Sequence, residues 1–425
     1  MIRNWFEKAS GKVRLLENGT ACVVLALIAL LPSVEVVARL FKSGIHSNTE
    51  YLRHLVLWIT FLGALITSRE KHHLSLSVGI DLLPPAIRQW VATAVGAVST
   101  AVSAGLTWCA WDLYRVAFDP ADTIGLLPIK VVTAILPAGF LFITIRFITG
   151  TPDWRHALCR ASGVGIAALI GFLSGPFMQV LIWPLAAVLT LSVFAGTPIF
   201  IVLGGNALLL FFTSGGSTAV IANEAYTMLT GPLIPTIPLF TLAGFILSES
   251  KSGERLVALF HEWFGWLPGG MVIMATLICA FFTTFTGASG VTILALGGLL
   301  SVVLLRSGYP KDFTEGLLTS SGSIGLLFPP SLPLILYGVV AQLDIKYLFI
   351  GGLFPGVLRV AMVAVLGIRQ DLHSGNTRRR FNLRNALSAL ASAGGEIAMP
   401  LVTLAAFFSG LTTLVESAAR IESKG

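Results

Sequence analysis

The stretch that decides the fold runs from Thr283 to Tyr337 and contains two polar interruptions of an apolar region. The first interruption reads TTFTGASG at 283–290. The second reads SSGSIG at 320–325 and is followed by PPSLP at 329–333. Glycine lowers the cost of unwinding a helix, and proline removes a backbone donor and clashes with the preceding turn. The sequence therefore predicts helices that break twice in succession within this stretch.

The rest of the chain has the composition of a membrane protein. Hydrophobic residues make up 55% of the 425 residues and charged residues 12%, which is about half the charged fraction of a soluble domain. Apolar runs of about 20 residues, the length that crosses a bilayer as a helix, recur along the chain. These runs are continuous rather than alternating, which favours helices over a barrel. We expect an all-α, polytopic transmembrane protein.

The net charge of +7 follows membrane topology rather than nucleic-acid binding. Basic residues cluster at the N-terminus, at 69–73 and at 146–160, and an acidic loop lies at 112–122. Because positive residues collect on the cytoplasmic side, this alternation predicts four crossings and a cytoplasmic N-terminus. We expect a four-helix membrane unit at residues 1–160 and no nucleic-acid partner. The four spans are predicted at Thr20–Phe41, Leu52–Thr67, Trp90–Tyr114 and Ile129–Ile148.

The later apolar segments predict a second membrane unit. Residues 161–189 are expected to form a connecting transmembrane helix, and Ser250–Trp266 to lie as an amphipathic helix at the interface. The two interruptions predict a re-entrant hairpin at 269–305 and a broken, unwound crossing at 314–341. Further apolar segments are predicted at Leu185–Leu203, Gly204–Tyr226, Leu233–Leu247, Tyr347–Leu366 and Ala386–Leu414.

Broken helices of this kind suggest a transport site. Their half-helix N-termini present N–H groups to anions, while their C-terminal ends and unwound carbonyls can coordinate Na⁺. Neither interruption, at 283–290 or at 320–333, contains a carboxylate, which argues against a proton relay or a divalent-metal site there. We therefore expect Na⁺ as the coupling ion and no other metal or cofactor. The hydroxyl groups that could supply hard oxygen ligands belong to Thr286, Ser289, Thr292, Ser320, Ser321 and Ser323.

Three alternatives stay open at this point. Small residues also let ordinary helices pack closely, so one such cluster alone would not indicate transport. An intramembrane enzyme would need catalytic groups within the spans, whereas the histidines fall in loops or at helix ends. A channel would need a ring of charges or a repeated pore motif, and neither is evident. Two interruptions in successive segments favour transport, and we expect no enzyme activity.

The chain also resembles a known family at the interrupted segments. It is similar to the membrane component of tripartite ATP-independent periplasmic (TRAP) transporters, in the form that fuses the small and large membrane subunits. Residues 1–160 resemble the small, four-helix subunit mainly through their helix count. The large-subunit motifs are PLFTLAG at 238–244, FTGASG at 285–290, GLLFPPSLPLILYG at 325–338, GGLFPG at 351–356 and ESAA at 416–419.

The resemblance implies an elevator-type, Na⁺-driven importer of organic acids in the bacterial inner membrane. Its substrate, a C4-dicarboxylate or related carboxylate, would come from a periplasmic substrate-binding protein. Sodium binding would fall on the hairpin tip and the unwound segment, and the substrate cavity on the proline-rich turn. The residues implied for Na⁺ are Thr286, Ser289, Gly290, Ser320, Ser321, Ser323 and Gly325, and those implied for substrate are Thr292, Pro329, Pro330 and Ser331.

The resemblance also implies two inverted repeats in the large subunit. The first repeat corresponds to residues 190–372, and residues 373–425 look like the start of a second. On this interpretation the chain is either a fragment that does not transport alone or a subunit completed by a second polypeptide. The arginine-rich segment Arg378–Arg384 is interpreted as a cytoplasmic topology signal, with binding of anionic membrane lipids as the alternative.

Overall fold

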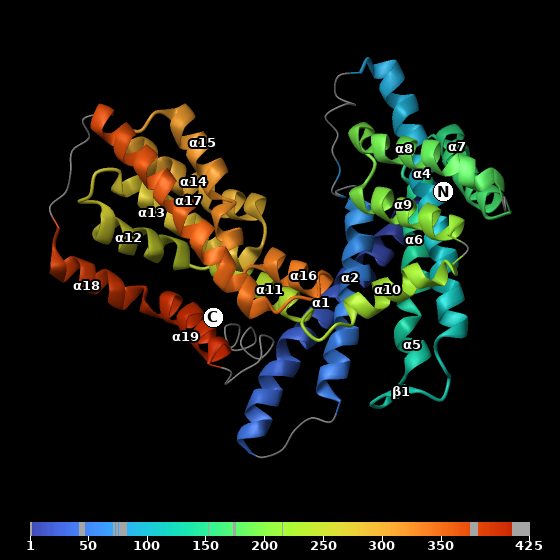
Figure 1. Ribbon diagram of the computed structural model, residues 1–425, viewed down its shortest axis with the longest axis horizontal. Helices are drawn as coiled ribbons and strands as arrows, with labels where there is room; N and C mark the ends of the chain where they lie inside the picture. The colour runs from blue at the N-terminus through green and yellow to red at the C-terminus, as the bar shows by residue number, and fades with distance from the viewer. Residues whose placement is uncertain are drawn as a thin grey trace. The chain divides into compact units, whose positions relative to one another are not determined.

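The computed structural model of the chain is almost wholly helical, which confirms the predicted all-α, polytopic class (Figure 1). Packing divides the chain into two compact units. The first comprises Met1–Leu27 and His46–Thr230, and the second Ile28–Ile45 and Gly231–Gly425. The division predicted from sequence, at 160, 189 and 372, stays a prediction. The structure describes residues 2–41, 47–70, 73, 75, 83–151, 153–172, 176–214, 216–374 and 381–409.

Within these ranges, six helices are long and apolar enough to cross a membrane. Two bent helix pairs would raise that number to eight if each pair is one span. Four of the six lie within the first 149 residues, where the sequence predicts four crossings. The six are Gly11–Glu35, Asn48–Glu70, Ile87–Val116, Ile129–Thr149, Ser289–Arg306 and Ile345–Leu372.

The first unit is built around the long helix α4 (Pro85–Val116), against which α6 and α7 pack. Small residues allow close contact: a Cβ at Gly163 of α7 would lie 3.0 Å from the Ala101 nitrogen of α4. Leu57 and Leu136 are fully buried between α2 and α6. The helices of this unit are α1 (Ile2–Leu40, through Leu27), α2 (Asn48–Glu70), α4, α5 (Ile129–Thr133), α6 (Ile135–Thr149), α7 (Trp154–Phe172), α8 (Pro176–Leu191), η1 (Ser192–Ala195), α9 (Ile199–Thr213) and α10 (Ala219–Leu229).

Two expected spans of this region are wrong as continuous helices. The segment Leu185–Leu203 is interrupted after η1, because Gly196 takes a left-handed conformation with φ 88° and Pro198 follows it. The segment Gly204–Tyr226 is divided between α9 and α10. Residues 161–189 fall in two helices, α7 and α8, with 173–175 outside the described residues.

One small element departs from an all-helical description. Strands β1 (Thr123–Ile124) and β2 (Leu127–Pro128) form an antiparallel hairpin directly after the acidic loop. Gly125 supplies the positive φ of 56° that this tight turn requires. The hydroxyl of Tyr51 accepts a hydrogen bond from the Leu126 nitrogen at 2.8 Å and anchors the turn to α2.

An ion-pair network ties three helices of the first unit together. Glu17 of α1 accepts hydrogen bonds from Arg69 of α2, at 2.9 Å, and from Arg146 of α6. Arg69 also contacts Asn18 at 3.0 Å and Glu70 at 3.1 Å. The Glu17 side chain is only 11% exposed, so its charge is largely screened from water and is balanced by the two arginines.

The second unit centres on α13 (Gly270–Thr286), which α11, α12, α14 and α17 contact (Figure 1). The predicted interfacial stretch forms the amphipathic helix α12, with Leu256 and Leu259 buried. The other helices of this unit are α11 (Thr236–Glu249), α12 (Ser252–Phe264), α14 (Ser289–Arg306), α15 (Lys311–Ser321), η2 (Ile324–Leu327), α16 (Leu332–Val340), α17 (Ile345–Ser374), α18 (Leu383–Ser392) and α19 (Gly394–Phe408).

The expected span Ala386–Leu414 is not a continuous helix over its described part. It is divided into α18 and α19, which meet at an angle of 68°. Trp263 of α12 donates a hydrogen bond to the Ala386 carbonyl at 3.2 Å, and Arg255 of α12 pairs with Glu396 of α19 at 2.9 Å. These contacts hold α18 against α12, and Gly394–Gly395 lower the cost of the bend. The motif at 416–419 and residues 375–380 lie outside the described residues.

A polar clamp joins the ends of α13, α14 and α17. The buried carboxylate of Asp371 accepts hydrogen bonds from the Tyr309 hydroxyl and from the Gly269 nitrogen, each at 3.1 Å. Burial, and then the charge of Asp371 and this hydrogen bond, raise the pKa of Tyr309 above its usual value. The clamp therefore holds the base of the α13–α14 pair to α17.

Replacing Tyr309 with phenylalanine should lower the free energy of unfolding by about 1–3 kcal/mol, because a charged acceptor loses a buried donor. Since the folded pKa of Tyr309 is raised, its contribution is complete below its unfolded pKa of about 10 and is lost as pH rises further. Denaturant titration in mixed micelles measures the change. Tyr347→Phe, at a 76% exposed site, is the matched control. Equal losses in both variants would contradict the clamp.

Candidate functional site

The first interruption is a two-residue break between α13 and α14. Gly287 takes φ 66°, and its nitrogen donates to the Thr283 carbonyl at 2.9 Å, which closes α13. Ala288 is extended, and α14 begins at Ser289. Across this turn the hydroxyl oxygens of Thr283 and Thr292 lie 2.9 Å apart, so the two helices fold back on each other at the tip. A break therefore stands where the sequence predicts the hairpin tip.

The second interruption unwinds the next crossing. Helix α15 ends at Ser321, a single 3₁₀ turn follows as η2, and α16 begins at Leu332. The two helical parts of this crossing meet at an angle of 46°. Pro329 and Pro330 lie in the loop before α16, and the Ser331 hydroxyl donates to the Leu326 carbonyl at 2.6 Å across that loop. The loop is thus closed on itself, with Ser331 fully buried.

Hydroxyl groups join the two interruptions. The Thr283 hydroxyl donates to the Gly322 carbonyl at 2.9 Å, and the hydroxyl oxygens of Thr286 and Thr292 lie 3.1 Å apart. These three threonines and the Gly322 carbonyl form what we call the hydroxyl cluster. All three side chains are at most 5% exposed. The cluster places four neutral oxygens where the C-terminal ends of α13 and α15 meet.

Glycines allow the backbones around this cluster to approach closely. A Cβ at Gly325 would lie 2.7 Å from both the Thr283 Cβ and the Thr284 nitrogen, and would also collide with the Ala280 carbonyl. The Thr284 hydroxyl donates to the Gly325 carbonyl at 3.0 Å. On α11, a Cβ at Gly244 would lie 2.9 Å from the Thr286 nitrogen. The motifs at 238–244 and 325–338 therefore contribute contact surfaces to the tip of α13.

The turn that precedes α14 also contacts the start of α16. A Cβ at Gly287, just before α14, would lie 2.9 Å from the Cβ of Leu332, the first residue of α16. Each helix N-terminus carries free N–H groups and the positive end of its dipole. The region thus combines two C-terminal ends that favour a cation with two N-terminal ends that favour an anion.

The predicted site residues occupy different surroundings. Ser289 is half-buried at the start of α14, and its hydroxyl forms no hydrogen bond with any described residue. Gly290 is exposed beside it. Ser321 is fully buried and faces Thr276 of α13 at 3.3 Å, whereas Ser320 is exposed and donates to the carbonyl of its own helix at Leu317. The structure therefore brings Ser289 to the hairpin tip and separates Ser320 and Ser321 from it.

The four residues predicted for the substrate cavity lie in two different places. Thr292 belongs to the hydroxyl cluster rather than to the proline-rich loop. Pro329 is half-buried and Pro330 buried within that loop, together with Ser331. The assignment of these four residues to substrate stays a prediction.

An arginine that the sequence analysis did not consider reaches the unwound segment. Arg359 of α17 donates from Nη2 to the Ser323 hydroxyl at 2.8 Å, and that hydroxyl donates to the Ser320 carbonyl at 3.1 Å. The approach of α17 depends on its own glycines, because a Cβ at Gly352 would lie 2.5 Å from the Leu327 carbonyl. An arginine inside the apolar span Ile345–Leu372 is the signal that could have identified it.

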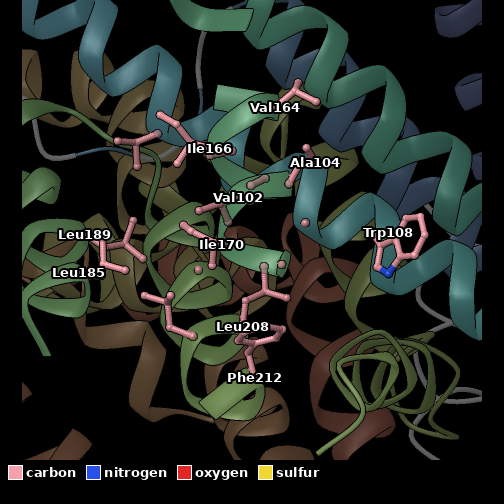
Figure 2. Close-up of a pocket in the computed structure, with 18 of the residues that line it drawn as sticks. Val102, Ala104, Trp108, Val164, Ile166, Ile170, Leu185, Leu189, Leu208 and Phe212 are labelled. Atoms are coloured by element: carbon pink, nitrogen blue, oxygen red, sulfur yellow. The ribbon is translucent and has the colours of Figure 1, made fainter. Parts of the chain in front are cut away.

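A separate cavity of about 610 Å³ lies in the first unit, between α4, α7, α8 and α9. Its lining is mostly aliphatic and aromatic, including Val102, Ile170 and Leu208 (Figure 2), and no charged residue lines it among those described. A site for a charged solute needs charged groups or several hydrogen-bond donors. The candidate functional site is therefore the pair of interruptions in the second unit.

Comparison with known proteins matches each of the two parts of the chain to a protein family. Residues 186–421 match the family "Tripartite ATP-independent periplasmic transporter, DctM component", and residues 28–151 match the corresponding DctQ component. The isethionate TRAP transporter permease of Oleidesulfovibrio alaskensis is 27% identical over 381 residues, which cover 87% of this chain and 60% of that protein.

Two further relatives carry other substrate names. A C4-dicarboxylate TRAP transporter large permease of Vibrio cholerae is 27% identical over 53% of this chain and 50% of its own length. The sialic acid TRAP transporter permease of Haemophilus influenzae is 26% identical over 93% of this chain and 67% of its own length. The chain thus spans about half to two thirds of the curated relatives that it matches.

The fold and the site define a polytopic membrane protein with two adjacent helix breaks, the architecture of a secondary-transport permease. Because the DctM component matches more than half of the chain, the chain belongs to the TRAP transporter permeases, with DctQ and DctM components fused. This confirms the resemblance seen in the sequence. The family consists of transporters, so the prediction that the chain is not an enzyme is also confirmed.

Proposed function

We propose that this chain is the membrane permease part of a Na⁺-coupled importer of organic acids. The observation that carries the proposal is the meeting of four helix ends at the two interruptions. The C-terminal ends of α13 and α15 favour a cation, and the N-terminal ends of α14 and α16 favour an anion. A site of this kind binds a cation and an organic anion together, which is what coupling requires.

The cation site is proposed at the hydroxyl cluster with Ser289. Alkali cations prefer oxygen ligands, and the cluster offers three hydroxyls and one carbonyl without a carboxylate among the described residues near it. The Ser289 hydroxyl supports this position, because it lies at the start of α14 with no protein partner that the structure describes. Na⁺ rather than a divalent ion fits neutral ligands of this type.

Ser323 takes a different role in this proposal. Its hydroxyl lies 2.8 Å from the Arg359 guanidinium, so a Na⁺ bound to Ser323 would stand close to a fixed positive charge. Even at an effective dielectric constant of 20, two like charges about 4 Å apart repel by about 4 kcal/mol. In this proposal Ser323 therefore binds Arg359 rather than Na⁺, and the Na⁺ ligands lie on the α13 side of Gly322.

The wider assembly follows from the family and the charge pattern. We place the permease in the bacterial inner membrane with its N-terminus in the cytoplasm, consistent with the basic N-terminal segment. A periplasmic substrate-binding protein would deliver the substrate, and the names of the relatives make carboxylates and sulfonates the substrate classes to test first. Elevator-type movement of the hairpin and completion by a second polypeptide belong to the same proposal.

Sodium binding by the purified full chain tests this proposal. Titration with ²²Na⁺ should show saturable binding that Na⁺ displaces and K⁺ does not. Ser289→Ala should weaken it about tenfold, which corresponds to about 1.4 kcal/mol, because the substitution removes one oxygen ligand. Ser301→Ala, on the same helix but three turns from the tip, is the matched control and should bind as the wild type does.

Absence of saturable Na⁺ binding, or displacement by K⁺ at equal concentration, would contradict the coupling claim. Equal weakening by Ser289→Ala and Ser301→Ala would move the cation site away from the hairpin tip. Ser321→Ala should reduce stability rather than Na⁺ affinity, because its hydroxyl faces Thr276 between two helices.

A further inference from the structure

Arg359 lies near the middle of an apolar span, where a charged side chain costs free energy. It lies 14 residues after Ile345 and 13 before Leu372, the ends of a span long and apolar enough to cross the membrane. At 1.5 Å per residue, about 20 Å of helix separates it from either end, more than its side chain can span. An ionised residue at such a depth faces a polar cavity or a charged partner, and it marks function by default.

Within the described residues, the protein provides a hydrogen-bond acceptor for only one of the N–H donors of Arg359. Nη2 donates to Ser323 at 2.8 Å, and Arg359 forms no ion pair with any carboxylate that the structure describes. A guanidinium has five N–H donors, so four have no partner within the described residues. The side chain is also half-buried rather than enclosed, which leaves those donors accessible. The arginine is oriented by Ser323 and has no counter-ion among the residues that the structure describes.

A purely structural role does not account for a charge here. The Ser323 hydroxyl needs one donor, which a neutral side chain would supply without the cost of a buried cation. Arg359 instead brings a positive charge to the start of the unwound segment that leads into α16. Ser323 directly follows Gly322, whose carbonyl belongs to the hydroxyl cluster. The serine that holds the arginine is thus the next residue in the chain after a carbonyl of the proposed cation site.

We infer that Arg359 is the anion anchor of this permease and binds the carboxylate or sulfonate group of the substrate through its free guanidinium edge. The inference rests on the proposed function and adds to it the residue that recognises substrate charge. A planar guanidinium binds such groups through two parallel N–H···O bonds, which an ammonium group cannot reproduce. Ser323 is its positioning residue, because it fixes one guanidinium nitrogen.

The position of the anchor also links the two ligands. Without an anion, the positive charge of Arg359 opposes Na⁺ binding at the neighbouring cluster. A bound carboxylate or sulfonate cancels that charge, so each ligand raises the affinity of the other. Coupling then follows from electrostatics at one unwound segment.

Sodium affinity with and without an anion tests the inference. The full chain in lipid nanodiscs is titrated with ²²Na⁺ alone and with saturating succinate, isethionate or N-acetylneuraminate. At least one anion should raise the wild-type Na⁺ affinity about tenfold, within the usual range of coupling between sites. Arg359→Gln should bind Na⁺ at least as tightly as the wild type and show no response to any anion. Arg359→Lys should respond weakly, and Arg306→Gln, at an exposed helix end, should respond fully.

An anion response that survives in Arg359→Gln would overturn the anchor, as would a wild type that responds to none of the three anions. If the wild type binds no Na⁺, the proposed function fails instead, and a second measurement still decides the anchor. Phenylglyoxal modification of Arg359, followed by mass spectrometry, should proceed in the free chain and slow at least fivefold with the responsive anion. No modification at Arg359, or modification that no anion slows, would overturn the anchor whether or not Na⁺ binds.

Discussion

Substituting alanine for Gly325 should lower the free energy of unfolding by about 3 kcal/mol and abolish the proposed Na⁺ binding. The new methyl group would lie 2.7 Å from the Thr283 Cβ and the Thr284 nitrogen and would collide with the Ala280 carbonyl. Backbone atoms cannot rotate away as a side chain can, so η2 must move off α13. Overpacking of this kind costs about 1–3 kcal/mol, and loss of the Thr284–Gly325 hydrogen bond adds about 1 kcal/mol.

Gly316→Ala on the neighbouring helix α15 is the matched control. A Cβ at Gly316 meets no atom within 4 Å, and alanine favours helix, so this variant should be as stable as the wild type or slightly more so. Equilibrium denaturation in mixed micelles and ²²Na⁺ titration measure the two consequences. If Gly325→Ala kept both wild-type stability and Na⁺ affinity, the contact between the unwound segment and α13 would not exist as described.

The second large loss in the free energy of unfolding is expected from a substitution in the ion-pair network of the first unit. Glu17→Gln removes the charge that Arg69 and Arg146 share, while keeping the size of the side chain. Because the carboxylate is only 11% exposed, the two guanidinium groups lose a partner that water cannot replace. Removing one member of a buried pair typically costs about 3–5 kcal/mol, and we expect about 3 because Arg69 keeps Glu70 and Asn18.

Glu70→Gln provides the comparison, since Glu70 pairs with the same Arg69 but is 38% exposed. Exposed pairs contribute about 1 kcal/mol or less. The thermal midpoint and the free energy of unfolding should therefore fall far more for Glu17→Gln. A similar small loss in both variants would show that the network of α1, α2 and α6 contributes little to the first unit.

The sequence predicted the membrane class and most element positions because hydropathy and charge are local properties. Runs of about 20 apolar residues and their flanking basic residues identify spans without any knowledge of packing. The predicted element positions were wrong where a contact between distant segments outweighed the local hydropathy signal. The span expected at Ala386–Leu414 is bent after α18 because Trp263 and Arg255 of α12 hold the two parts.

The candidate site was predictable only in part for a similar reason. Thr286, Ser289 and Thr292 were identified by residue type and by their place at a break, whereas Thr283 was not among the predicted ligands. Ser320, Ser321 and Ser323 share that residue type, yet they have three different surroundings. Side-chain direction at an unwound segment depends on the neighbouring helices, and no periodic pattern of the sequence records it.

What the sequence determined by itself is where the helices of this permease break, since Gly287, Gly322, Gly325 and the prolines at 329–333 change the local backbone energy directly. Only the tertiary structure decided what those breaks face. It joined Thr283 to the Gly322 carbonyl and brought Arg359 from α17 to Ser323. Contacts between residues 36 to 39 positions apart depend on how glycine-lined helices pack, which is a property of the assembled fold rather than of any single segment.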